Sequence, residues 1–318
     1  MRWVGLGKIF DPTEHALANG CVQFAQSPQA LVFDDFVRIY FSTRSLDGSG
    51  KFLSHIAFVD MHKNLRDVIR VSDRTVISLG RLCCFDEHGI FPMSVVRVGD
   101  AVYGYTCGWN RRVSVSVDTA IGLAISRDDG LTFQRIGDGP VLAASLHEPC
   151  LVGDGFVKIM GDKFHMWYIF GTGWKKYSTA APPDRTYKIG HAVSANGIEW
   201  VKEEARQIIP DQLGPDESQA LPTVIEIGGR YHMFFCYRQS FDFRQNKDRG
   251  YGIGHAWSVD LLDWTRDDDY PRLNGTAGEW DSDMQCYPHV FESDGRVYLL
   301  YNGNEFGRYG FGLAMLEP

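Results

Sequence analysis

Short apolar segments separated by polar turns run along the whole chain, and one of these segments recurs. IGLAIS at Ile121, IGHAVS at Ile189, IGHAWS at Ile253 and FGLAML at Phe311 share one pattern, and a weaker copy, SHIAFVD, begins at Ser54. Alternation of this kind predicts strands, whereas no window keeps the spacing of an amphipathic helix. The repetition indicates one β-sheet module used five times.

Each copy of the recurring strand is expected to follow a hairpin and to precede a fourth strand. Turn pairs such as Gly-Asp and Gly-Gly separate β-branched and aromatic segments in the hairpins. The next turn, SRDDGLTF from Ser126, matches the Asp box of sialidases, but a polar residue closing a turn explains it structurally. Residues 1–318 are therefore predicted to form an all-β, single-domain five-bladed β-propeller with four strands per blade, closed by the N-terminal RWVGLGKIF.

Charge and composition exclude some partners. The chain has 318 residues and a net charge of -8, which does not favour nucleic-acid binding. No apolar run is long enough to span a bilayer and no signal peptide is evident, so we expect a cytoplasmic protein. The seven cysteines, without a C-x-x-C pair, are expected to be reduced.

Acidic residues stand where four of the five modules begin. Glu87, Glu217 and Asp283 each lie five residues before the proline of an innermost strand, and Asp154 opens the innermost strand of the third module. The innermost strands of a propeller surround its axis, and carboxylates that face one another can supply an acid and a base. These residues predict an axial site, although each would also fit a solvated loop.

The hairpins resemble those of the five-bladed glycoside hydrolases of families 32, 43, 68 and 117 and of the family 130 phosphorylases. GDGFVKIMGDKFHMWY places Asp154 at the aspartate of the family 32 R-D-P motif. DESQALPTVIEIGGRYHMFF places Glu217 at the glutamate of the E-C motif. The resemblance implies that Glu217 is the general acid and that Asp154 orients the substrate or stabilises the transition state.

The sequence departs from this pattern in the first blade. The family has a D-P pair there, whose carboxylate is the nucleophile or base, but this chain has Ser27 before the proline. An inverting hydrolase or a phosphorylase is therefore favoured over a retaining hydrolase. The base is expected to be Asp11, Glu87 or phosphate itself, and Asp11 also fits a turn that begins at Asp-Pro.

Cationic and aromatic residues follow the second strand of each module. Arginine forks bind phosphate or carboxylate, so an oligosaccharide or sugar phosphate is the expected substrate, although surface salt bridges would use the same residues. The candidate substrate-binding residues, which include one carboxylate, are Arg44, Trp109, Arg111, Arg112, Trp174, Tyr237, Arg238, Asp283, Tyr301 and Arg308.

The expected function is that of a carbohydrate-active enzyme that cleaves or transfers a glycosidic bond. No cofactor or metal is expected, apart from an axial ion near His289 that the resemblance to family 43 raises. Two alternatives stay open. The missing aspartate of blade one fits a non-catalytic carbohydrate-binding propeller, and the basic rim fits a glycosyltransferase of polysaccharide synthesis.

Overall fold

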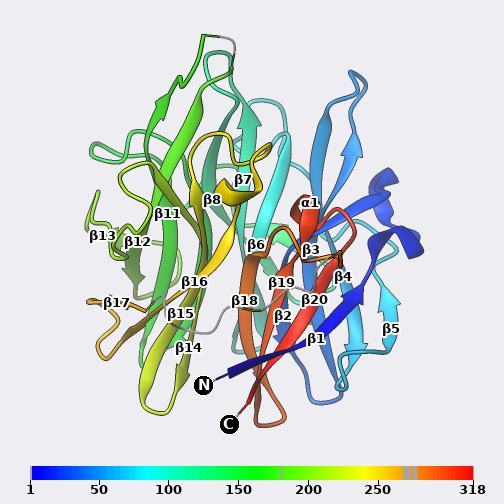
Figure 1. The fold of residues 1–318 in the computed structure, drawn as a ribbon. Coiled ribbons are helices and arrows are strands. Elements are labelled where there is room, and N and C mark those ends of the chain that lie inside the picture. The colour runs from blue at the N-terminus through cyan, green and yellow to red at the C-terminus, as the bar shows by residue number, and fades with distance from the viewer. Residues whose placement is uncertain (1, 180, 268–272, 274–277, 318) are drawn as a thin grey trace.

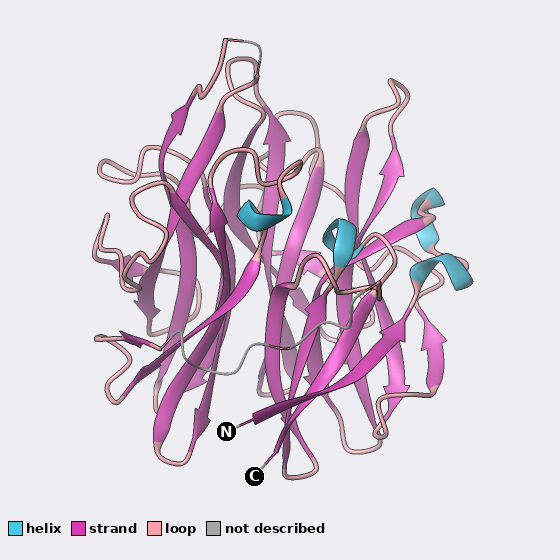
Figure 2. Cartoon of the chain, viewed as in Figure 1, coloured by secondary structure: helices cyan, strands magenta, loops and turns pink. Residues whose placement is uncertain are grey.

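Strands form nearly all of the regular structure (Figures 1 and 2). The computed structural model describes residues 2–179, 181–267, 273 and 278–317. Short helical turns lie in the loops: η1 (Pro12–Glu14), η2 (Ala18–Gly20), η3 (Lys247–Arg249) and α1 (Asn304–Gly307). None of the helices found in these residues is long and apolar enough to cross a bilayer. All seven cysteines are free thiols.

The strands group into five blades, numbered in chain order. Blade one holds β2 (Gln23–Val32), β3 (Phe36–Leu46), β4 (Phe52–His62) and β5 (Val68–Val71). Blade two holds β6 (Gly89–Val98), β7 (Ala101–Arg111), β8 (Val117–Ser126) and β9 (Gln134–Arg135). Blade three holds β10 (Val152–Met160), β11 (Lys163–Lys175), β12 (Asp184–Ser194) and β13 (Val201–Lys202). Blade four holds β14 (Glu217–Ile227), β15 (Arg230–Gln239), β16 (Gly252–Ser258) and β17 (Thr265–Arg266). Blade five holds β18 (Cys286–Ser293), β19 (Arg296–Asn302), β20 (Phe311–Glu317) and β1 (Arg2–Phe10).

The N-terminal strand completes the last blade, as the sequence predicts. β1 pairs antiparallel with β20, with Arg2 opposite Glu317 and Phe10 opposite Phe311. In Figure 1 the blue N-terminal strand lies beside the red C-terminal one. Each innermost strand packs against the next one around the ring, and β18 packs against β2. A single parallel pair, Ser54 with Gly89, also joins blades one and two into one continuous sheet.

Hydrogen bonds from tyrosines fasten neighbouring blades at the turns between their outer strands. Ser126 Oγ accepts the backbone N–H of Gly130 and so closes the turn of the Asp box. Tyr40 of blade one donates to the carbonyl of Gly130, and Tyr105 of blade two donates to the carbonyl of Gly197 in the corresponding turn of blade three. The Asp box is therefore a structural turn between β8 and β9 that links two blades.

All five innermost strands carry a bulge at the same place. The pairing register shifts within β2, β6, β10, β14 and β18, and a proline follows the bulge in every blade except blade three, where Gly155 follows. Proline has no N–H for the ladder, and a bulge bends a strand and redirects its side chains. The five equivalent positions, called the bulge residues below, are Ser27, Phe91, Asp154, Leu221 and Tyr287.

Candidate active site on the propeller axis

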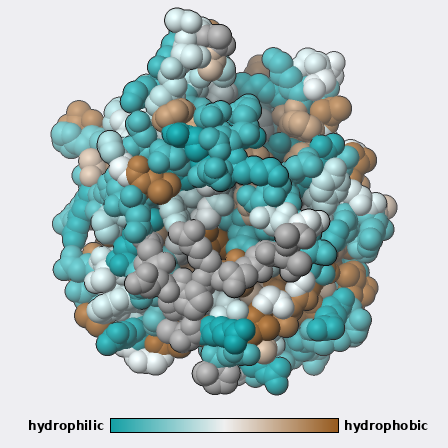
Figure 3. Space-filling view, in the orientation of Figure 1, coloured by the Kyte–Doolittle hydropathy of each residue, from teal (hydrophilic) through white to brown (hydrophobic). Residues whose placement is uncertain are grey.

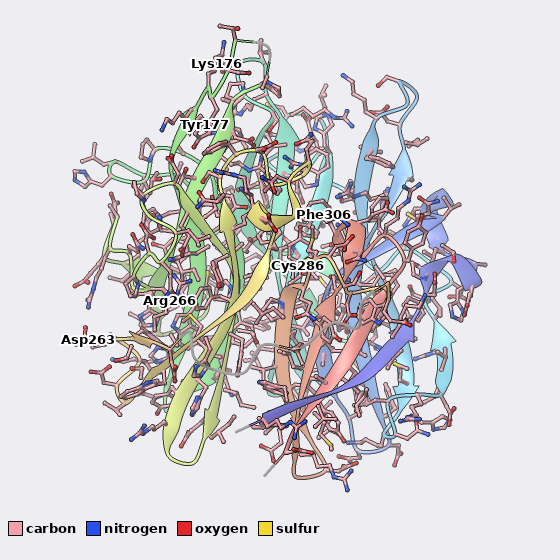
Figure 4. All side chains as sticks on the ribbon, viewed as in Figure 1. Lys176, Tyr177, Asp263, Arg266, Cys286 and Phe306 are labelled. Carbon is pink, nitrogen blue, oxygen red and sulfur yellow. The ribbon has the colours of Figure 1, made fainter. Side chains whose placement is uncertain are left out.

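A cavity of about 360 Å³ opens on the axis, and the bulges shape its floor. Four of the bulge residues line the cavity, and blade one contributes Gln26, the neighbour of the fifth. Phe306, which Figure 4 labels on α1, adds to the wall. The volume is within the usual range for small-molecule sites, roughly 300–1,000 Å³.

Asp154 is a buried carboxyl in this cavity. Its backbone has a φ of 51°, in the left-handed region that non-glycine residues seldom adopt, and its side chain is almost fully buried. Burial raises the pKa of Asp154 to about 7, against the opposing effects of the Leu221 N–H, the Arg185 charge and a hydrogen bond from Cys107. A carboxyl with such a pKa holds its proton for part of the time at neutral pH and can donate it.

Arginines from three blades surround this one acid. Arg44, Arg185, Arg238 and Arg244 line the cavity, and among the lining residues that the structure describes only Asp154 carries a carboxyl group. The chain as a whole has more acids than bases, 40 against 32. The charged residues of the described lining are therefore mainly positive, opposite in sign to the net charge of the protein.

Arg238 is held rigidly. Its guanidinium donates to the Tyr187 hydroxyl at 2.8 Å and to the Gln239 carbonyl at 2.8 Å, and it lies 3.6 Å from the centre of the Phe243 ring. The Tyr187 hydroxyl in turn shares a hydrogen bond of 2.8 Å with that of Tyr251. The Arg244 guanidinium lies 4.2 Å from the centre of the Phe243 ring. Burial together with the charges of Arg185 and Arg238 lowers the pKa of Arg244.

Glu217, the general acid predicted from the sequence, is not among the residues that line the cavity. Its carboxylate is fully buried and pairs with Arg266 at 2.7 Å. Burial alone would raise its pKa, but hydrogen bonds from Gln219, from the backbone of Leu213 and Gln212, and from Arg266 hold the pKa below its usual value. An acid that is ionised and saturated with donors has no proton to give to a leaving group.

The Glu217 ion pair is one of a repeated set. In blades two, three and four the carboxylate that enters the innermost strand pairs with a basic residue on the short fourth strand. The three pairs are Asp86 with Arg135, Glu148 with Lys202, and Glu217 with Arg266. Figure 4 shows Arg266 beside β17, the outermost strand of its blade. The position of Glu217 is therefore explained by the construction of a blade.

The other acids named from the sequence lie outside the cavity lining. Asp11 caps η1 and pairs with Lys8, and Asp283 pairs with Lys247 at 2.5 Å. Glu87 accepts the N–H of Cys83 and lies 3.2 Å from His88. All three acids therefore have other partners, and none of them is among the residues that line the cavity.

The arginines predicted to form a cationic rim fall into two groups in the structure, those that line the cavity and those that form surface ion pairs. Arg44 and Arg238 line the cavity, but Arg111 pairs with Asp47 at 2.7 Å, Arg112 pairs with Asp118, and Arg308 pairs with Glu305 at 3.1 Å. The last three arginines are neutralised by surface acids outside the cavity lining. Their ion pairs are those that the interpretation as surface salt bridges describes.

Of the predicted sugar-stacking aromatic residues, one lines the cavity and the others lie outside its lining. Trp109 lines the cavity and stacks on His88, with 5.9 Å between the ring centres. Trp174 lies behind the wall, with the Arg185 guanidinium 5.4 Å from its ring centre. Tyr237 and Tyr301 are buried outside the lining: Arg266 lies over the ring of Tyr237, and the hydroxyl of Tyr301 donates to Asp281.

Sequence reasoning missed several lining residues. Arg185, Arg244, Tyr187, Tyr251 and Tyr287 all line the cavity. A signal for Tyr287 was present, because the residue before the proline is the bulge residue in four of the blades. Arg185 and Tyr187 lie on β12, and Arg244 and Tyr251 lie in the β15–β16 connection, where no repeated pattern indicates which side chains reach the axis.

His289 lies two residues beyond the bulge residue of β18 and lines a different cavity from Asp154. Both of its ring nitrogens are buried without a hydrogen-bond partner in the described residues, and burial lowers its pKa to about 3. Within the described part of the chain no three His, Cys, Asp or Glu side chains come together as metal ligands. The described residues therefore offer no such group of three ligands near His289.

Comparison with solved structures places this fold among five-bladed carbohydrate-active propellers. A glycoside hydrolase matches with a TM-score of 0.74 at 18% identity, over 99% of this chain and 91% of the other. The β-1,2-mannobiose phosphorylase from Listeria innocua matches with a TM-score of 0.65 at 12% identity, over 96% and 94%. Structures of glycoside hydrolase families 32, 43 and 130 match as well. The chain has the propeller fold of these glycoside hydrolases and phosphorylases, as the resemblance predicts.

Two relatives define the family. The uncharacterized proteins MT1551 and Rv1502 of Mycobacterium tuberculosis are each 33% identical to this chain over 323 aligned residues, covering 100% of both partners. The chain belongs to the family of these two proteins. No family model matches it.

Proposed function

We propose that the protein is a glycoside phosphorylase-like enzyme that uses inorganic phosphate to cleave a glycosidic bond, with Asp154 as general acid. The observation that carries the proposal is the composition of the cavity. Its one carboxyl group among the described lining residues has a pKa raised to about 7, and arginines lie around it. A buried acid with this pKa serves proton transfer, whereas binding alone gives no reason to bury it.

The lack of a second carboxylate in the described lining favours phosphate over water as the nucleophile. A hydrolase needs a base to activate water or a carboxylate to attack the sugar, and blade one offers Ser27 at that point. Phosphate is already an anion and needs no base. Arg185, Arg238 and Arg244 supply the guanidinium groups that bind its oxygens.

The proposed reaction is a single displacement. A phosphate oxygen forms a bond to the anomeric carbon while the bond from that carbon to the glycosidic oxygen breaks. Asp154 transfers its proton to the departing oxygen, so the products are a sugar 1-phosphate with inverted configuration and a free hydroxyl. The Asp154 carboxylate that remains is stabilised by the nearby Arg185 charge.

The reverse reaction provides a direct test. Purified protein is incubated with the 1-phosphates of glucose, galactose and mannose together with a set of acceptor sugars, and released inorganic phosphate is measured. We expect release from at least one pair, and the Asp154→Asn variant should lower turnover by about 10²- to 10⁴-fold while sugar binding survives.

Asp283→Asn is the matched control, because it removes an acid that lies outside the cavity lining and pairs with Lys247. Its turnover should equal that of the unmodified protein. Full turnover by Asp154→Asn would refute the assignment of the acid. Cleavage of oligosaccharides at an equal rate without phosphate would refute phosphorolysis in favour of hydrolysis.

A further inference from the structure

Arg44 is a cavity arginine for which the described residues provide no counter-ion. It lies on β3 and lines the cavity, with its guanidinium carbon 4.4 Å from the ring centre of Phe24 and 5.3 Å from that of Phe52. No ion pair joins it to any carboxylate in the described residues, and its Nε is buried without a hydrogen-bond partner there. Aromatic faces support the cation, but they do not neutralise its charge.

This arrangement differs from that of the arginines around the rim. Arg111, Arg112 and Arg308 each pair with a surface acid, whereas the described residues form no ion pair with Arg44. Burial, together with the charge of Arg244, lowers the pKa of Arg44. Arg44 is partly buried. A partly buried charge that the described residues leave without an ion-pair partner is unfavourable in the free protein, so a ligand that supplies the opposite charge would relieve that cost.

Arg44 also approaches the cavity from a different side than the other three arginines. It belongs to blade one, whose neighbours in the ring are blades two and five. The other three arginines belong to blades three and four: Arg185 lies on β12, Arg238 on β15, and Arg244 in the β15–β16 connection. Phe52, beside Arg44, is 46% exposed and lines the cavity. A sugar ring that packs on Phe52 would bring a substituent within reach of Arg44.

We propose that the sugar bound in this cavity is itself anionic, and that its carboxylate or phosphate substituent binds Arg44. This anion is separate from the inorganic phosphate assigned above to Arg185, Arg238 and Arg244. The inference rests on the proposed function only in taking a sugar as the ligand. It requires neither phosphorolysis nor a proton from Asp154, so it can be tested by binding alone.

Calorimetric titration with matched sugars tests the proposal. The probes are glucose, galactose and mannose, their uronic acids, their 6-phosphates, and inorganic phosphate. In at least one series an anionic sugar should bind about tenfold or more tightly than its neutral counterpart, and Arg44→Met should remove that preference. The uronic acid and phosphate arms distinguish which of the two anionic groups is recognised.

Two variants separate the role of Arg44 from general effects of charge. Arg112→Met removes a positive charge from an exposed arginine paired with Asp118 and should bind every probe as the unmodified protein does. Arg44→Lys keeps the charge but loses the fork, so it should retain part of the preference. Thermal unfolding of each variant establishes that it is folded before it is titrated.

Two results would overturn the proposal. One is equal binding of neutral and anionic sugars in all three series, or no binding of any sugar in them. The other is an Arg44→Met variant that weakens inorganic phosphate as much as it weakens the anionic sugars, which would place Arg44 in the phosphate site. A protein that binds anionic sugars through Arg44 but never releases phosphate would refute only the proposed phosphorolysis.

Discussion

Asp154 owes its position and its acidity to one local feature, the bulge of β10. The positive φ places the carboxyl in the cavity, and the bulge residues of neighbouring blades bury it there. Sparsely populated backbone conformations persist where the surrounding structure enforces them, and they gather at functional sites. At the scale of the residue, a positive φ directs the Asp154 carboxyl into the cavity. Its burial there disfavours the ionised form, so the pKa of this acid lies near neutrality.

The pH dependence of turnover should report this acid. Asp154 must be protonated to act, and burial raises its pKa from 3.8 to about 7, so turnover should be present at pH 6 and fall as pH rises through about 7. The Cys107 hydrogen bond favours the ionised carboxylate and lowers the pKa, so Cys107→Ala should move this fall to higher pH. Initial rates across pH 5–9 measure the shift.

Cys107→Ser and Cys150→Ala are the controls for this experiment. The serine hydroxyl can donate to Asp154 as the thiol does, so the fall in rate should return toward its original pH. Cys150 is a free thiol outside the cavity lining, and its loss should leave the profile unchanged. An identical profile in Cys107→Ala would mean that the thiol does not act on Asp154.

At the scale of the element, the blade explains which acids are structural. Each of the three buried ion pairs joins the entry of an innermost strand to the fourth strand of the same blade, and so ties together the two edges of a sheet. The fourth strands have only two residues in blades two, three and four. So short a strand gains little from its ladder, and the ion pair adds a fixed attachment.

Glu217→Gln and Glu148→Gln should therefore behave alike. Each leaves a buried cation without its carboxylate, in blade four and in blade three, which typically costs about 3–5 kcal/mol of unfolding free energy. Urea unfolding measures the loss. Turnover per folded molecule should remain, because neither residue lines the cavity.

A different result would support the role of Glu217 as general acid that the sequence predicts. If Glu217→Gln unfolds at the same urea concentration as the unmodified protein and yet loses turnover, while Glu148→Gln loses stability, Glu217 acts in catalysis. The paired design matters because a loss of activity by itself would not separate an unfolded blade from a missing acid.

At the scale of the whole molecule, the N-terminal strand closes the ring. β1 covers the edge of β20, and Trp3 and Phe10 are buried against blades four, one and five. The surface in Figure 3 is mainly hydrophilic with separate apolar patches, so the cationic cavity is a local exception in an acidic protein. Closure keeps that cavity in shape, because its walls come from all five blades.

Removal of residues 1–10 should abolish cooperative folding. It exposes the hydrogen-bonding edge of β20 and leaves the sites of Trp3 and Phe10 empty, and an unpaired strand edge invites association. Thermal unfolding measures whether a cooperative transition remains. Size-exclusion chromatography measures whether the truncated chain elutes at the size of the unmodified protein.

A permuted chain is the matched control for this truncation. Residues 2–10 are moved behind residue 317 with a short glycine-containing turn, since Arg2 lies opposite Glu317 in the antiparallel pair. This chain should fold as the original does. A truncated protein that melts at the original temperature without associating would show that β1 is dispensable for closure.

The architecture of the propeller follows from the sequence alone. The recurring strand, the turn pairs and the N-terminal segment predict five four-stranded blades and their closure, and the structure confirms each of these. Such features are local and repeated, so hydrophobic alternation and turn chemistry are sufficient to specify them. The same repetition predicts that Asp154 opens an innermost strand beside the axis, and the structure has its carboxyl in the axial cavity.

Which charged side chains face the axis depends instead on the tertiary structure. Glu217 and Asp154 both open innermost strands, yet one points to Arg266 on an outer strand and the other lies in the cavity. Arg44 and Arg111 both lie on second strands, but only Arg111 pairs with an acid in the described structure. The partner that neutralises a charge comes from a distant part of the chain, so no local pattern specifies whether a charged residue stabilises the fold or awaits a ligand.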